Sequence, residues 1–285
     1  MSFNPQPSKP KLELPRGACD AHFHVFGPQK VFPLAAQRSY TPDGDAPKAA
    51  LFKLHAMLGI ERGVVVQSAV HGFDNSAAAD LIAAKEGQYV GVALLPAATG
   101  MKELKKLHQQ GFRGVRFHFM KHMGEAAAMD DVLALAERLA EIGWHLQIHL
   151  ESTLIADMAS ALKRSPVPVV IDHMGRIDAS LGMDQAPFRH LLSLLKSKHV
   201  WVKVSGAERI SRKPSPWPDA IPFARQLVEE FGDRALWGTD WPHPNLQAVP
   251  DDGVLVDLLS EIAPSEREKR ALLVGNPQRF YGFQA

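Results

Sequence analysis

Two histidines one residue apart, His22 and His24, are the first candidates for chemistry in this chain. They lie in the run 19–26, whose apolar residues predict a β-strand. Side chains at positions i and i+2 of a strand point to the same face, so both imidazoles can reach one site. The pair alone is also compatible with chance, because the chain contains 13 histidines.

Three further polar residues, His149, His173 and Asp240, stand at the ends of other apolar runs. If these runs are parallel strands, their carboxyl ends meet at one edge and the side chains share one site. Neutral imidazoles and a carboxylate are the ligands that a mononuclear zinc site prefers. The residues leave two interpretations open, a metal site and a metal-free electrostatic pocket. For Asp240 a helix N-cap is a third.

Short apolar runs alternate with amphipathic segments along the chain. The expected strands are 19–26, 63–67, 90–95, 114–119, 145–150, 167–173, 200–205 and 235–240, and the expected helices are 46–58, 75–86, 101–110, 129–142, 152–163, 187–196 and 218–231. Continuous apolar strands followed by amphipathic helices are typical of a parallel sheet covered on its outer face. Eight such units in 285 residues predict a single (β/α)8 TIM barrel, with an open doubly wound sheet as the alternative.

Composition excludes several classes of partner. The 32 basic and 31 acidic residues nearly cancel, so no overall field attracts phosphate backbones or anionic lipid. We therefore expect no nucleic acid and no membrane partner. Cys19 is the only cysteine, which excludes an internal disulfide and fits a reducing compartment.

The N-terminal residues 1–16 contain four prolines and no apolar core of a secretion signal. This predicts an N-terminal arm (1–16) followed by one barrel domain (17–285), and a cytoplasmic protein. The sequence leaves the oligomeric state open; an oligomer is possible.

Several segments together carry a family resemblance. The His-x-His start, His173 and Asp240 resemble the amidohydrolase superfamily of distorted (β/α)8 barrels. A closer resemblance, to the 2-pyrone-4,6-dicarboxylate lactonase group, is carried by Gly27-Pro28, His71-Gly72-Phe73-Asp74-Asn75, Gly114-Val115-Arg116-Phe117, Ile171-Asp172-His173-Met174-Gly175-Arg176 and Trp237-Gly238-Thr239-Asp240-Trp241-Pro242-His243-Pro244-Asn245. These matches span almost the whole chain beyond the N-terminal arm.

The resemblance implies hydrolysis of a lactone ring in a small polycarboxylate. Asp240 would activate water and later protonate the leaving oxygen, while His22, His24 and His173 would polarise the carbonyl. The substrate's carboxylates would be bound by guanidinium groups, whose rigid fork can donate two hydrogen bonds. The residues expected to bind substrate are Arg116, Arg176, Arg209, Tyr40, His149, His243 and Ser68.

Each substrate-binding expectation has an alternative. Arg113 and Arg212 compete with the three arginines, and His71 lies close to Ser68 in the sequence. Tyr40 is equally compatible with packing at the barrel mouth. His243 is equally compatible with orienting Asp240 or with stabilising its loop.

One position departs from the lactonase group, since His149 stands where the group has a tyrosine. The group works without a divalent metal, so we expect no cofactor. The alternative is one divalent metal such as zinc, held by His22, His24, His149, His173 and Asp240. The departure also keeps other functions open: hydrolysis of 4-sulfomuconolactone or a sugar-acid lactone, a metal-dependent decarboxylase of the same superfamily, and a non-catalytic binding barrel.

Overall fold

Eight parallel strands form the centre of the molecule in the computed structural model, which describes residues 2–124, 126–246 and 248–284. They are β1 (Cys19–Phe23), β2 (Arg62–Val66), β3 (Tyr89–Leu94), β4 (Phe112–Phe119), β5 (His145–Leu150), β6 (Val169–Ile171), β7 (Val200–Lys203) and β8 (Ala235–Leu236). Each pairs with the next in chain order. The ends of the sheet meet where the Ala21 amide donates to the Trp237 carbonyl at 2.8 Å. The chain is a distorted (β/α)8 barrel, as the sequence predicted.

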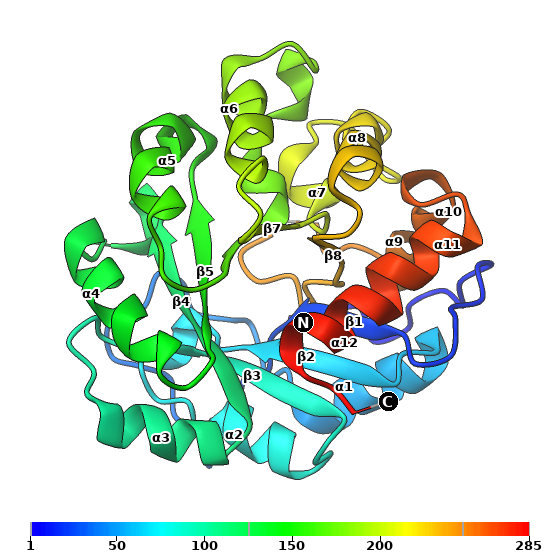
Figure 1. Cartoon of the computed structure of the whole chain (residues 1–285). Coiled ribbons are helices and arrows are strands. Elements are labelled where there is room, and N and C mark those ends of the chain that lie inside the picture. Colours follow the sequence, from blue (N-terminus) through cyan, green and yellow to red (C-terminus); the bar gives the residue numbers. More distant parts are fainter. Residues whose placement is uncertain (1, 125, 247, 285) are drawn as a thin grey trace.

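Helices surround the strands on the outside (Figure 1). The α-helices are α1 (Lys48–Leu58), α2 (Ser76–Ala83), α3 (Met101–Gln109), α4 (Met129–Ala140), α5 (Ile155–Lys163), α6 (Ala186–Leu195), α7 (Ala207–Ile210), α8 (Ile221–Phe231), α9 (Asp252–Asp257), α10 (Leu259–Ile262), α11 (Glu266–Arg270) and α12 (Asn276–Tyr281). Short turns of other helix types are η1 (Ala69–His71), η2 (Lys121–Met123), η3 (Ser152–Leu154), η4 (His173–Arg176), η5 (Ala179–Leu181) and η6 (Ala271–Gly275). Their apolar faces bury the outward side chains of the strands in one large core.

The C-terminal helix closes the amino-terminal end of the barrel. Tyr281 and Phe283 pack in one buried cluster with Cys19, Val90 and Trp201, all near the starts of their strands. In Figure 1, α12 lies across the barrel beside β1 and β2. This packing leaves the opposite end of the barrel free for chemistry.

Six strands end earlier than the sequence predicted, β2 and β3 by one residue and four others by two or more. β1, β6, β7 and β8 stop before the polar residues that were expected to end them. The physical reason is clearest at His173 and Asp240, whose φ angles of 47° and 63° lie in the left-handed region and cannot continue a pleated strand. The candidate site residues therefore lie partly on the loops that follow the strands.

The N-terminal arm is anchored on the barrel. The backbone amide of Ser8 donates to Asp251, and that of Leu12 to Asp257 at 2.9 Å. These contacts fix the arm against α9. None of the helices in the described ranges is both long and apolar enough to cross a membrane.

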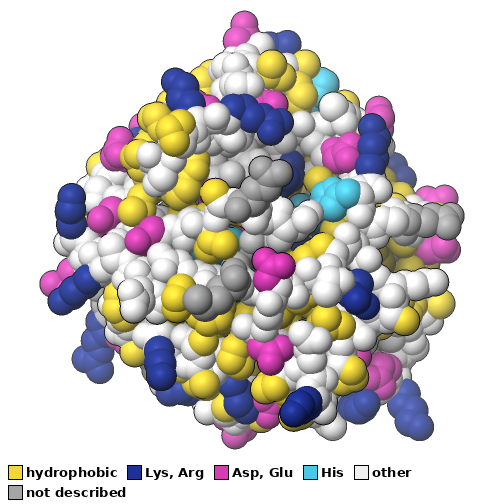
Figure 2. All heavy atoms as spheres, turned by 180° about the vertical axis from the view of Figure 1, so that it is seen from behind, with side chains coloured by type: hydrophobic (Ala, Val, Ile, Leu, Met, Phe, Trp, Pro, Cys, Tyr) yellow, Lys and Arg dark blue, Asp and Glu magenta, His cyan; other side chains and the backbone are white. Residues whose placement is uncertain are grey.

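The charged side chains of the outer surface are mixed in sign. In Figure 2, which views the molecule from behind, Lys and Arg side chains alternate with Asp and Glu around the periphery. This face therefore carries no extended field of one sign, in keeping with the near-zero net charge of the sequence.

Candidate active site

A cavity of about 110 Å³ lies at the carboxyl ends of the strands. Its lining residues come from many separate βα connections, which is how barrel enzymes assemble their sites. They are His24, Ser39, Tyr40, Ser68, Ala69, Arg116, His118, His122, Met123, His149, His173, Arg176, Arg209, Asp240, Pro244, Asn245 and Leu246.

Asp240 is the centre of the site. Its Oδ1 atom lies 3.2 Å from Nε2 of His24, 3.6 Å from Nε2 of His22 and 3.8 Å from Nε2 of His173. Its other oxygen accepts a hydrogen bond from Nε of Arg209. Burial alone would raise the pKa of the carboxyl, but Arg209 and the histidines bring that pKa well below its usual range. Asp240 is therefore an anion at neutral pH.

The position of the ring hydrogen on His24, which faces Asp240, can be deduced from its contacts. Its Nδ1 lies 2.8 Å from the Val66 carbonyl, which can only accept, so Nδ1 carries a hydrogen. In a neutral ring Nε2 is then bare, yet it lies 3.2 Å from the Asp240 carboxylate. The contact is favourable only if a further proton or another cation lies between the two groups.

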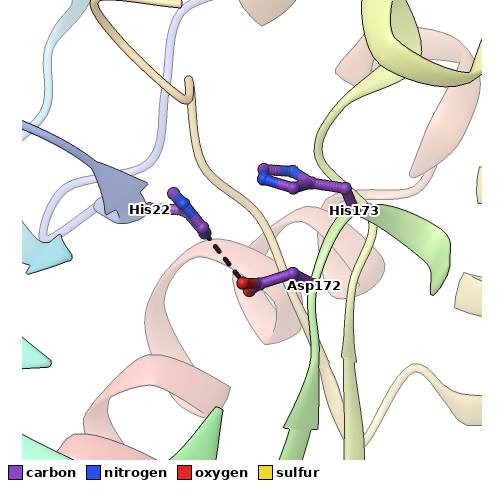
Figure 3. A group of neighbouring side chains, drawn as sticks. All are labelled: His22, Asp172 and His173. Atoms are coloured by element: carbon purple, nitrogen blue, oxygen red, sulfur yellow. Dashed lines mark ion pairs between the residues drawn. The ribbon is translucent and has the colours of Figure 1, made fainter. Parts of the chain in front are cut away.

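His22 lies beneath the cavity, so it is placed differently from the expectation that it contacts the substrate. It is fully buried and is not among the described lining residues. Its Nδ1 is 3.1 Å from Nζ of Lys203 and 3.3 Å from Oδ1 of Asp172. Figure 3 shows the His22 and Asp172 side chains facing each other, with the ring of His173 above them. Burial and Lys203 lower the pKa of His22 well below its usual range, which makes the ring neutral.

Two of the three expected arginines are already paired inside the protein. Nε of Arg116 donates to Asp172 at 2.8 Å, and Arg209 pairs with Asp240. Arg176 also lines the cavity, and within the described part of the chain it forms no ion pair. Burial, and next the nearby Arg209, lowers the pKa of Arg176 to about 10, so it still carries its charge at neutral pH. Arg176 is therefore the guanidinium most available to a ligand.

His149 forms a pair with His118 at the cavity wall. Their Nδ1 atoms lie 3.1 Å apart, and within the described ranges both Nε2 atoms are buried without a partner. One Nδ1 must donate and the other accept. The pair therefore presents one Nε2 donor and one Nε2 acceptor.

The remaining expected residues divide into two groups. Tyr40 and Ser68 line the cavity, and burial raises the pKa of Tyr40 above its usual value. His243 does not line it among the described residues; its Nε2 faces Asp252 at 3.0 Å, which favours the alternative that it stabilises its loop. The His243 side chain instead belongs to the buried packing behind the Asp240 loop.

The competing residues take other positions. Arg113 bonds backbone carbonyls and Arg212 pairs with Asp178 on the surface, so neither lines the described cavity. His71 lines a larger adjoining cavity that shares Arg116, His118 and His122 with the first.

Sequence reasoning missed a buried polar layer below the cavity. Lys203, Gln147 and Asp172 are each fully buried and bonded to one another. Burial lowers the pKa of Lys203 to about 8. One feature of the sequence could have predicted this layer: Lys203 ends the apolar run Val200-Trp201-Val202. A lysine buried in a sheet needs polar partners.

Backbone conformation also marks the site. His173, Arg176 and Asp240 all have positive φ angles. Such conformations cost about 1–3 kcal/mol each and persist where the surrounding structure holds them. Here they occur in the loops after β6 and β8, whose side chains line one cavity.

The donor set for a metal is present in part. Atoms of His22, His24 and Asp240 lie within 4.8 Å of one another, as do those of His22, Asp172 and His173. The carbonyl bond at Nδ1 orients His24 as metal-ligating histidines usually are. His149 belongs to neither described set. Within the set of His22, His24 and Asp240, Nε2 of His22 faces Asp240, so it can bind an ion there only if it carries no hydrogen.

Comparison with known proteins defines the class. The amidohydrolase family profile matches residues 19–283, so the chain belongs to the amidohydrolase family. It is 45% identical to the 2-pyrone-4,6-dicarboxylate hydrolase of Comamonas testosteroni, over 96% of this chain and 93% of that protein. It is 39% identical to the 4-sulfomuconolactone hydrolase of Hydrogenophaga intermedia, over 95% of this chain and 91% of that protein.

A solved structure agrees with these relatives. It is that of a Pseudomonas putida protein described as a candidate 2-pyrone-4,6-dicarboxylic acid hydrolase, and it superimposes with a TM-score of 0.84. That match is 33% identical and covers 95% of this chain and all of the other. The resemblance inferred from the motifs is confirmed.

Proposed function

We propose that this chain is a hydrolase that opens the lactone ring of a small polycarboxylate, with 2-pyrone-4,6-dicarboxylate as the first candidate substrate. The observation that carries the proposal is the convergence of three imidazoles and Arg209 on one carboxylate, Asp240, beside the guanidinium of Arg176, which forms no ion pair among the described residues. The relatives that hydrolyse lactones support it.

In the proposed reaction Asp240 is the general base. It takes a proton from water as the water oxygen attacks the lactone carbonyl carbon. The bond between that carbon and the ring oxygen then breaks, and the same proton passes from Asp240 to the leaving oxygen. Arg209 holds Asp240 in its weakly basic form until a substrate carboxylate competes for the guanidinium.

The carbonyl oxygen gains negative charge during the attack. His173 lines the cavity next to Asp240 and supplies a group that stabilises it, as does His24 once its Nε2 holds a proton. His22 lies below and acts on Asp240 rather than on the substrate.

Arg176 is the proposed anchor for a substrate carboxylate, because Arg116 and Arg209 already have carboxylate partners. His118 and His149 line the same cavity, and their Nε2 atoms, one a donor and one an acceptor, have no partner among the described residues. They can bond a sulfonate or hydroxyl as well as a carboxylate, so 4-sulfomuconolactone and sugar-acid lactones are the alternative substrates.

We propose that the reaction proceeds without a bound metal. In the alternative, a divalent ion would be held by His22, His24 and Asp240 and would act as a Lewis acid on the carbonyl. Metal analysis of protein purified without added zinc separates these two mechanisms.

The test is a panel of 2-pyrone-4,6-dicarboxylate, 4-sulfomuconolactone and a neutral sugar lactone, with hydrolysis followed by acid release. We expect turnover of a polyanionic lactone. Asp240→Asn should lower kcat by about 10²- to 10⁴-fold with little change in KM. Asp178→Asn, which alters a surface carboxylate paired with Arg212, is the matched control. A fully active Asp240→Asn variant, or a wild-type protein inert toward every lactone, would contradict the proposal.

A further inference from the structure

Lys203 is a buried lysine to which the proposed reaction assigns no step. It stands at the end of β7 with no exposed side-chain surface. Its Nζ donates to Oε1 of Gln147 at 2.8 Å and lies 3.1 Å from Nδ1 of His22 and 3.6 Å from Oδ1 of Asp172. Three polar atoms thus surround the three hydrogens of one ammonium group.

The contact with His22 has a defined direction. An ammonium group has three donors and no lone pair, so a ring nitrogen 3.1 Å away must accept from it. A hydrogen on Nδ1 of His22 would instead point at the positively charged group.

Asp172 is the competing partner of the same nitrogen, at 3.3 Å. Its other oxygen, Oδ2, is occupied by Nε of Arg116 at 2.8 Å and Nε2 of Gln147 at 3.1 Å. Its Oδ1 faces both His22 and Lys203 (the His22 contact is the dashed line of Figure 3). This oxygen forms an ion pair with the Lys203 ammonium at 3.6 Å without any hydrogen on the histidine, so Asp172 does not require one there.

We propose that Lys203 is a positioning residue that fixes His22 in the tautomer with hydrogen on Nε2, and thereby keeps a divalent metal off this nitrogen. Nε2 of His22 is buried and points toward Oδ1 of Asp240 at 3.6 Å. With its hydrogen there, the ring supports the Asp240 anion and offers no lone pair to an ion. His24, held by the Val66 carbonyl, has the opposite tautomer.

The value of this tautomer for catalysis rests on the proposed function. The assignment of the tautomer itself rests only on the contacts of Lys203. The tautomer also affects the group of His22, His24 and Asp240, whose donor atoms lie at metal-ligating distance. One hydrogen on one nitrogen removes a ligand from the set.

The first test is long-range ¹H–¹⁵N NMR of the ¹⁵N-histidine-labelled wild-type protein, with His22 assigned from the signals missing in His22→Gln. The two tautomers differ in which nitrogen resonates in the protonated range and in which ring hydrogens couple to it. We expect the protonated nitrogen of His22 to be Nε2. A protonated Nδ1 with a bare Nε2 overturns the proposal, and this measurement needs no variant of Lys203.

The second test compares zinc retention and tautomer in variants. Lys203→Met removes the donor with little change in volume, so Nδ1 of His22 can donate to Asp172 and Nε2 becomes bare. We expect this variant to retain several-fold more zinc than the wild type after loading and desalting, and to show the exchanged tautomer. Lys203→Arg, which keeps a donor, should restore the wild-type spectrum.

The control is Lys269→Met, which removes another buried lysine, far along the chain on α11, that pairs with Glu266. It should match the wild type in both readouts. An unchanged His22 spectrum in folded Lys203→Met would show that Lys203 does not set the tautomer. Neither readout uses a lactone, so a failure of the proposed function and a failure of this inference are distinguishable.

Discussion

Asp240 shows how one carboxylate can be prepared for proton transfer in a buried site. Its two oxygens face different groups, the imidazoles on one side and Arg209 on the other. In the proposed reaction the lactone carbonyl lies on the histidine side and a substrate carboxylate on the arginine side. A dianionic lactone can therefore loosen the Arg209 contact and raise the basicity of Asp240 as it binds.

Arg176 yields a prediction at this scale. Arg176→Met should raise KM for a dicarboxylate lactone by roughly 10- to 100-fold, because a charge-assisted hydrogen bond contributes about 1.5–3 kcal/mol. The effect on kcat should be smaller, since Arg176 is proposed to hold the substrate rather than the reacting atoms. Steady-state kinetics measure both constants.

The control for this variant is Arg212→Met, which removes an exposed arginine paired with Asp178. It should leave KM unchanged. Equal KM values for wild type and Arg176→Met would show that another residue binds the substrate carboxylate.

At the scale of elements, the seam between β1 and β8 positions the catalytic groups. Oδ1 of Asp20 accepts from the backbone amides of His22 and Thr239, both at 3.0 Å, and Oδ2 accepts from the Thr239 hydroxyl at 2.6 Å. One buried carboxylate thus ties the strand that carries His22 to the loop that carries Asp240. The distance between the His22 and Asp240 side chains depends on this tie.

A substitution at Gly238 can test whether the seam between β1 and β8 sets the site geometry. A Cβ atom at this position would meet the backbone nitrogen of His22 and, at 2.7 Å, Oδ1 of Asp20. Gly238→Ala should therefore destabilise the protein by about 1–3 kcal/mol and lower kcat, because the seam must open. Urea unfolding and steady-state kinetics check the two effects.

Gly100→Ala is the matched control, because a Cβ there meets no atom of the described ranges within 4 Å. It should change stability by only a few tenths of a kcal/mol. If Gly238→Ala were as stable and active as this control, the seam would not be the element that sets the site geometry.

At the scale of the whole molecule, buried neutral histidines make stability depend on pH. Burial is the largest cause of a lowered pKa at His22, His118, His145, His149 and His173. Each folded pKa lies below the unfolded value, so between the two values the unfolded chain binds more protons. Stability is therefore lost as the pH falls below about 6.5.

His145 lies away from the cavity, so its contribution to the pH dependence of stability can be measured separately. It packs against Phe280 and Tyr281 at the closed end of the barrel, and its pKa falls to about 3. Its share of the lost stability is roughly 2 kcal/mol between pH 6.5 and 5, at about 1.4 kcal/mol per pH unit. His145→Gln should remove this share, as measured by urea unfolding at several pH values.

His190→Gln is the control for this prediction, because His190 is exposed on α6. Its unfolding free energy should follow the pH dependence of the wild type. A His145→Gln variant with the full wild-type dependence would show that His145 is protonated in the folded state.

The amino-acid sequence determined the fold class and most of the residues that line the site. Apolar strands alternating with amphipathic helices can bury both kinds of face only in a covered parallel sheet, and eight such units fit one barrel. Polar residues at strand ends were recognisable because they interrupt that pattern, as at His24, His173 and Asp240. Their convergence followed from the parallel arrangement of the strands.

Tertiary structure alone decided which of these groups face a ligand and which face one another. Two of three expected arginines have carboxylate partners, His243 faces Asp252, and His22 lies below the cavity against Lys203. These pairings join residues far apart in the chain, and the charge of each group depends on burial and on its partner's distance. Neither quantity is a property of the local sequence, because both arise only when the barrel closes.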